Sequence, residues 1–140
     1  MDIKRVIAGL TFSLLMVNSA TVGAFMLHDS YSCEVKSAQQ VGEDGSLVPD
    51  EFRKRLYINS KFVIDRHTGR MLGKPKNYSG LDQPEIMDKG SEEQSLKVIT
   101  IYGPHVYIDY LIVEIYVDAL KKPFMFISSS TIYTGLCKGL

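Results

Sequence analysis

The residues of this chain that are best suited to chemistry lie in one short stretch, Phe62 to Gly73. Asp65 and His67 stand two positions apart there and offer a carboxylate and an imidazole for acid–base work. The alternative is a purely structural turn, in which the aspartate accepts backbone N–H groups and the arginines are hydrated. We expect this structural role. The candidate binding surface consists of Asp65, Arg66, His67, Arg70, Lys74 and Lys76.

Other patterns for catalysis or metal binding are weak. The serines at 128–130 have no GxSxG elbow around them, and the remaining histidines, His28 and His105, are far apart in the chain. Asp82, Glu85 and Asp88 supply oxygen ligands but lack the spacing of a calcium loop. We therefore assign no catalytic residue, no metal and no cofactor, and regard an enzyme built on Asp65 and His67 as the least favoured interpretation.

A β-hairpin must position the candidate surface. Phe62 and Ile64 alternate with Val63 and Asp65, which is the period of two expected of a strand. Gly69 follows the turn residues and takes a positive φ at little cost, so a type I turn closed by a glycine bulge is predicted.

Charge is balanced over the whole chain but not along it. The formal net charge is zero, which gives no indication of nucleic-acid binding. Residues 53–76 nevertheless carry eight cations and the single acid Asp65, whereas residues 82–93 carry five acids and the single cation Lys89. The basic stretch either forms a face for an anionic envelope polymer or an acidic partner protein, or is neutralised by the acidic stretch that follows.

The first 24 residues have the layout of a secretory signal peptide. Lys4 and Arg5 precede an apolar run of about a dozen residues, and Val22 and Ala24 satisfy the small-residue rule before a cleavage site. That run is short of the roughly 20 residues needed to span a bilayer, although an uncleaved anchor is the alternative. We expect residues 25–140 to form a single exported domain, periplasmic or secreted.

Two cysteines, Cys33 and Cys137, stand near the ends of the expected mature chain. In an oxidising compartment only one disulfide can form between them. Closing so long a loop would contribute about 4 to 5 kcal/mol in the chain-entropy model. A reactive or metal-binding thiol pair is the alternative, but neither cysteine has a CxxC partner.

The remaining pattern predicts an all-β chain, with one short helix after Pro49 or a strand from Leu56 in its place. Strand signals cover 31–36, 96–102, 106–117, 124–127 and 131–137, with a bend expected at Asp109-Tyr110 and one long loop predicted over residues 74–95. We predict a small antiparallel β-barrel or sandwich, closed by a disulfide between its first and last strands.

Taken together, Tyr31-Ser32-Cys33, the hairpin DRHTGRMLG and the terminal Gly-Leu-Cys resemble small exported bacterial two-cysteine β-rich proteins of unassigned function. The cysteine frame also looks loosely like periplasmic lysozyme inhibitors of the small-barrel type. Their serine-glycine inhibitory loop and tryptophan-containing strand have no counterpart here. The expected function is an envelope-associated binding module, with a hydrolase inhibitor acting through the loop at 77–95 or a hairpin tip as the alternative.

Overall fold

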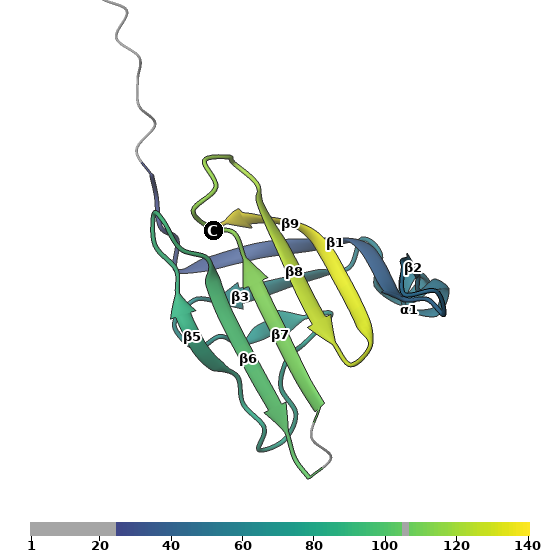
Figure 1. The fold of residues 1–140 in the computed structure, drawn as a ribbon. Helices are drawn as coiled ribbons and strands as arrows, with labels where there is room; N and C mark the ends of the chain where they lie inside the picture. Colours follow the sequence, from purple (N-terminus) through teal and green to yellow (C-terminus); the bar gives the residue numbers. More distant parts are fainter. Residues whose placement is uncertain (1–24, 105–106) are drawn as a thin grey trace, which may run out of the picture.

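The computed structural model describes residues 25–104 and 107–140, so the predicted signal peptide and His105 lie outside the described residues. Within these residues, nine strands and one helix follow one another in sequence order, and Figure 1 shows their arrangement. They are β1 (Ser30–Val41), β2 (Leu47–Pro49), α1 (Glu51–Tyr57), β3 (Lys61–Asp65), β4 (Met71–Gly73), β5 (Glu85–Lys89), β6 (Leu96–Tyr102), β7 (Tyr107–Val113), β8 (Lys122–Ser128) and β9 (Thr131–Gly139).

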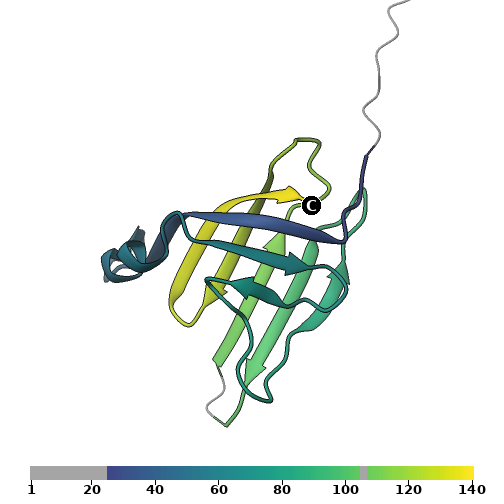
Figure 2. The same ribbon diagram turned by 180° about the vertical axis from the view of Figure 1, so that it is seen from behind.

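The strands form one antiparallel sheet in the order β4-β3-β1-β9-β8-β7-β6-β5, with β2 paired to β1. Figures 1 and 2 show that the sheet curls, so that β3 and β4 lie opposite β6 and β7. The edge strands β4 and β5 are not paired with each other. The predicted small antiparallel fold is therefore confirmed, in the form of a curled half-barrel.

The core lies inside this curl. Strand β1 buries Tyr31, Cys33 and Val35, the side chains that the alternation of this segment predicts for its inner face. The facing strands contribute a further set of fully buried side chains: Phe62, Ile64, Met71, Leu96, Val98, Leu111, Val113 and Phe126. Burial on this scale supplies the main driving force for folding.

The β3–β4 hairpin closes the curl against the other half of the sheet. Gly69 has a φ of 71°, and its N–H donates to the carbonyl of Asp65 at 2.8 Å. A Cβ at Gly69 would lie 2.9 Å from Val98 Cγ1 in β6 and 3.2 Å from Ile86 Cγ1 in β5. Glycine is required here both by the turn and by the close approach of the two edges.

The prediction of one irregular loop over 74–95 is wrong, because β5 lies within it and pairs with β6. Only Ile86 and Asp88 of β5 are half-buried. As an edge strand with a bulge after Ile86, it carries too few apolar residues to give a clear alternating pattern.

The predicted strand over 106–117 is too long. Strand β7 ends at Val113, and the chain then turns, with the N–H of Ile115 bonded to the carbonyl of Val113. Ile115 is still fully buried, so its apolar character reflects a core position outside a strand. The bend predicted at Asp109-Tyr110 is also wrong, since β7 keeps an unbroken register there with both β6 and β8.

The short helix is confirmed, and the strand alternative from Leu56 is wrong. Asp50 caps α1 by accepting the N–H of Arg53 on Oδ1 at 2.9 Å. Phe52 and Leu56 are exposed, while Tyr57 at the end of the helix packs on the core. No helix among the described residues is long and apolar enough to cross a membrane.

Cys33 and Cys137 form the predicted disulfide. They face each other in the register of β1 and β9, with their Cα atoms 3.9 Å apart. The bridge joins the first and last strands, as predicted, but it lies in the middle of the sheet order and does not mark the open side of the sheet. The open side lies between β4 and β5 instead.

Candidate functional site

The carboxylate of Asp65 is used by its own turn. Its Oδ1 accepts the backbone N–H groups of His67 and Thr68 at 2.9 and 2.8 Å and the Thr68 hydroxyl at 3.0 Å. The hydrogen bond from the Thr68 N–H is the main reason that the pKa of Asp65 lies below its ordinary value. This oxygen therefore organises the turn and has little capacity left for a ligand.

Arg66 and His67 contact the N-terminal end of the described chain. His67 Nε2 lies 2.9 Å from Asp29 Oδ1, and a guanidinium nitrogen of Arg66 lies 3.9 Å from the same oxygen. The Arg66 N–H also donates to the backbone carbonyl of Asp29 at 2.9 Å. The imidazole thus meets Asp29 and not Asp65, so the proposed acid–base pair is not brought together.

The other predicted cations lie over tyrosine rings. The guanidinium of Arg70 is 4.2 Å from the centre of the Tyr78 ring, and Lys76 Nζ is 5.5 Å from the same ring. Lys74 Nζ is 4.9 Å from the centre of Tyr57. Each of these cations lies within about 6 Å of a ring centre, where the face of the ring attracts it.

Arg53 of α1 joins this set, with its guanidinium 6.0 Å from the centre of the Tyr57 ring and 5.9 Å from that of the exposed Phe52 ring. We call Arg53, Arg70, Lys74 and Lys76 the cation set. Within the described chain, the ion pairs shorter than 4.0 Å do not include any of these four side chains. None of those pairs joins the basic stretch to the acidic residues at 82–93 either.

The two tyrosines that carry the cation set line a pocket of about 280 Å³. It opens between α1, the segment at 75–79, the β6–β7 pair and the β8–β9 pair. We call it the tyrosine pocket, and its lining residues are Arg53, Tyr57, Pro75, Lys76, Tyr78, Ser79, Tyr102, Tyr107, Asp109, Phe126, Ser128 and Tyr133.

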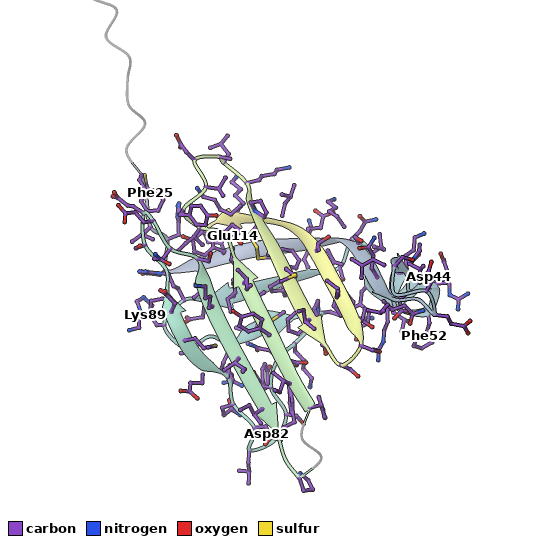
Figure 3. All side chains as sticks on the ribbon, viewed as in Figure 1. Phe25, Asp44, Phe52, Asp82, Lys89 and Glu114 are labelled. Atoms are coloured by element: carbon purple, nitrogen blue, oxygen red, sulfur yellow. A yellow bond between two sulfur atoms is a disulfide. The ribbon has the colours of Figure 1, made fainter. Side chains whose placement is uncertain are left out.

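Figure 3 shows Asp82 at the end of the molecule where β6 leads to β7, and Phe25 and Lys89 toward the opposite end.

Asp109 is the most unusual member of this lining, because it is an acid only 4% exposed. The Tyr102 hydroxyl donates to its Oδ2 at 2.6 Å, and the Tyr107 ring stacks on Tyr102 at 4.5 Å. Its other oxygen, Oδ1, is buried and has no hydrogen-bond partner. Ser128, opposite in β8, is near enough to lower the Asp109 pKa somewhat but does not satisfy Oδ1.

Burial dominates the titration of this pair. Removal from water raises the pKa of Asp109, against the lowering effect of the Tyr102 hydrogen bond. Burial and the adjacent Asp109 raise the pKa of Tyr102 well above its usual range, so its hydroxyl keeps the proton that it donates. Strongly perturbed pKa values cluster at functional sites, and buried unsatisfied polar groups are rare, so Asp109 is a candidate site residue.

Sequence reasoning missed Asp29, Tyr57, Tyr78, Tyr102 and Asp109 as possible site residues. A usable signal existed for Asp109, which has the same strand parity as Leu111 and Val113. A charged residue on the apolar face of a strand is seldom buried without a purpose. No comparable signal in the chain pairs Tyr57 or Tyr78 with particular cations.

A second hollow, of about 210 Å³, lies over the disulfide and is also basic, with Lys36, Lys61, Lys121 and Lys138 in its lining. Its polar side chains are all at least partly exposed, and Lys36 is paired with Glu34. It lacks the buried polar group that distinguishes the tyrosine pocket. Across the part of the chain that the structure describes, no three His, Cys, Asp or Glu side chains are grouped to hold a metal ion.

Comparisons with protein-family models, with curated proteins and with solved structures find no match for this chain. Arguments about function therefore rest on its own residues.

Proposed function

We propose that this protein is an exported, envelope-associated binding module that holds an anionic polymer on the cation set. The observation that carries the proposal is the placement of four cations on two tyrosine rings beside one pocket, without an acid paired to any of them among the described residues. A cluster of one sign beside a concave surface attracts ligands of the opposite sign.

The signal-peptide pattern and the disulfide between Cys33 and Cys137 support an oxidising compartment outside the cytoplasm as the place of action. Anionic polymers are abundant partners in such surroundings, and the acidic-partner alternative would use the same cations. The hairpin turn at Asp65 then serves as the support from which Arg70 enters the cation set.

The test is retention on immobilised heparin, a polyanion, at low ionic strength, where charge attraction is least screened. We expect the native protein to be retained and to elute with salt. The double variant Arg70→Gln/Lys76→Gln should elute at clearly lower salt. The matched control Lys121→Gln/Lys138→Gln removes the same charge from the hollow over the disulfide and should elute like the native protein. Absence of native retention, or equal shifts for both double variants, would contradict the proposal.

A second candidate, inhibition of a hydrolase, is favoured by one side chain. Leu81 is 98% exposed and projects from a tight turn in which Ser79 and Asp82 exchange backbone hydrogen bonds of 3.1 and 2.8 Å. An inserted loop of this kind would need such an exposed apolar tip. If this candidate is correct, the native protein slows cell-wall lysis by lysozyme and Leu81→Asp does not; no slowing by the native protein rejects lysozyme as the target.

A further inference from the structure

Asp109, one of the lining residues of the tyrosine pocket, has a carboxylate oxygen that accepts no hydrogen bond from the protein. Asp109 Oδ1 is buried and lacks a donor, while Oδ2 of the same carboxyl group is held by Tyr102. Leaving a buried polar oxygen unsatisfied costs about 1 to 3 kcal/mol, and more for a charged group. Because Oδ1 has almost no accessible surface, a ligand group reaches it only when a lining side chain moves aside, and a hydrogen bond donated there recovers that cost.

The surroundings restrict what kind of donor this is. Arg53 and Lys76 line the same pocket, so an ammonium group of a ligand would meet two like charges. A neutral hydroxyl avoids that repulsion, and the phenol and serine hydroxyls of the lining can exchange further hydrogen bonds with a ligand that carries several hydroxyls.

The size and the aromatic lining of the pocket also favour a small ligand that carries several hydroxyl groups. A volume of about 280 Å³ is near the lower limit of about 300 Å³ for small-molecule pockets, so it suits one small ring and not a long chain segment. Tyr107 is 48% exposed at the pocket, and an aromatic ring of this kind packs well against the apolar face of a sugar.

We propose that the tyrosine pocket is a subsite for one acidic sugar unit, whose hydroxyl donates to Asp109 Oδ1 and whose carboxylate lies toward Arg53 and Lys76. This inference rests on the proposed function, because the sugar is taken to be a unit of the anionic polymer that the cation set holds. Asp109 is then the residue that distinguishes a hydroxyl-bearing acid from other anions of similar charge.

The experiment measures binding of three probes by calorimetry to the native protein, without its signal peptide and with the disulfide intact. The probes are trigalacturonate, which is an acidic trisaccharide, maltotriose, which is neutral, and tripolyphosphate, which has charge but no sugar hydroxyl. We expect trigalacturonate to bind at least tenfold more tightly than maltotriose.

The variant Asp109→Asn keeps the shape of the side chain and can still accept from Tyr102, but places an amide donor near the position of Oδ1. We expect it to weaken trigalacturonate at least tenfold and to leave tripolyphosphate within twofold of the native value. A second variant, Ser79→Phe, adds a bulky ring at an exposed lining position and leaves Tyr102 and Asp109 unchanged in sequence, and it should weaken trigalacturonate in the same selective way.

The outcomes separate the two proposals. If the native protein binds tripolyphosphate but trigalacturonate no better than maltotriose, the sugar subsite is wrong and the polyanion function stands. The sugar subsite is also wrong if both variants bind trigalacturonate like the native protein, or if Asp109→Asn weakens both anions equally while Ser79→Phe changes neither. If neither anion binds to the native protein and heparin does not retain it, the proposed function itself is wrong.

Discussion

Two aspartates illustrate how environment decides the role of a residue in this protein. Asp65 is in a turn, where three donors converge on one oxygen and hold its pKa low. Asp109 is in a strand within the half-barrel, where burial raises its pKa and one oxygen has no partner. The first carboxylate is consumed by local structure, whereas the second retains an unused bonding capacity, which makes it the stronger site candidate.

Gly69 allows a test at the same scale, because Gly45 is a matched control. Both have positive φ, 71° and 82°, so alanine at either position costs about 1 to 2 kcal/mol in backbone strain. A Cβ at Gly69 would press on Val98, while the space around Gly45 is open to beyond 4 Å. We expect Gly69→Ala to lose about 1 to 3 kcal/mol more than Gly45→Ala in urea unfolding. Equal losses would show that the turn, and not the packing, requires glycine.

At the scale of elements, one side chain supplies hydrogen bonds to the backbone at the open side of the half-barrel. Asn77 is 1% exposed; its Oδ1 accepts the N–H of Met71 at 2.9 Å, and its Nδ2 donates to the carbonyl of Gly69 at 2.8 Å. Its own carbonyl accepts the Thr100 hydroxyl of β6 at 2.7 Å. Asn77 thus takes the place of a neighbouring strand beside β4 and connects it to the far half of the sheet. Its buried amide also leaves the sequon Asn77-Tyr78-Ser79 unsuited to glycosylation in the folded chain.

Truncation of this amide should weaken the closure of the sheet. Asn77→Ala leaves a buried donor and a buried acceptor unpaired, and we expect a loss of about 3 kcal/mol in the free energy of unfolding. Gln83→Ala removes an exposed amide bonded to the Gly80 carbonyl and should change stability by less than about 0.5 kcal/mol. Urea denaturation followed by far-UV circular dichroism measures both. Similar values for the two variants would show that β4 needs no such cap.

At the scale of the whole molecule, the disulfide joins β1 and β9, the neighbouring strands that carry the two ends of the fold. It spans 104 residues of sequence, and the chain-entropy model assigns about 4 to 5 kcal/mol to a loop of that length. The sheet around it is paired on both sides, so we expect the reduced protein to keep its fold with lower stability.

This expectation is tested by thermal unfolding with and without a reductant. The native protein should lose at least 10 °C of its unfolding midpoint on reduction, since about 4 kcal/mol corresponds to a shift of that order or larger in a chain of this size. The unfolding midpoint of the variant Cys33→Ala/Cys137→Ala should lie near that of the reduced native protein and should not change when reductant is added. An unchanged native midpoint, or two free thiols in the denatured and unreduced protein, would contradict a stabilising bridge.

By itself, the sequence determined the features that depend on neighbouring residues or on counting. The hairpin around Gly69, the antiparallel strands and the pairing of two cysteines follow from turn chemistry, alternation and arithmetic. The short helix after Pro49 was one of two interpretations that the sequence left open, and its cap by Asp50 is seen only in the structure. Weak local patterns caused the errors: β5 is an edge strand with little apolar character, and Ile115 is buried without belonging to a strand.

Only the tertiary structure decided the site. The tyrosine pocket joins α1 and the segment at 75–79 to the β6–β7 and β8–β9 pairs, which follow later in the chain and meet the first two because the sheet curls. The basic stretch was visible in the sequence as a run of charge. Only the curl of the sheet brings some of its cations to Asp29 and others to the rings of Tyr57 and Tyr78. The unpaired oxygen of Asp109 is likewise a result of packing. A local sequence pattern does not indicate which buried acceptor will lack a hydrogen-bond donor in the folded chain.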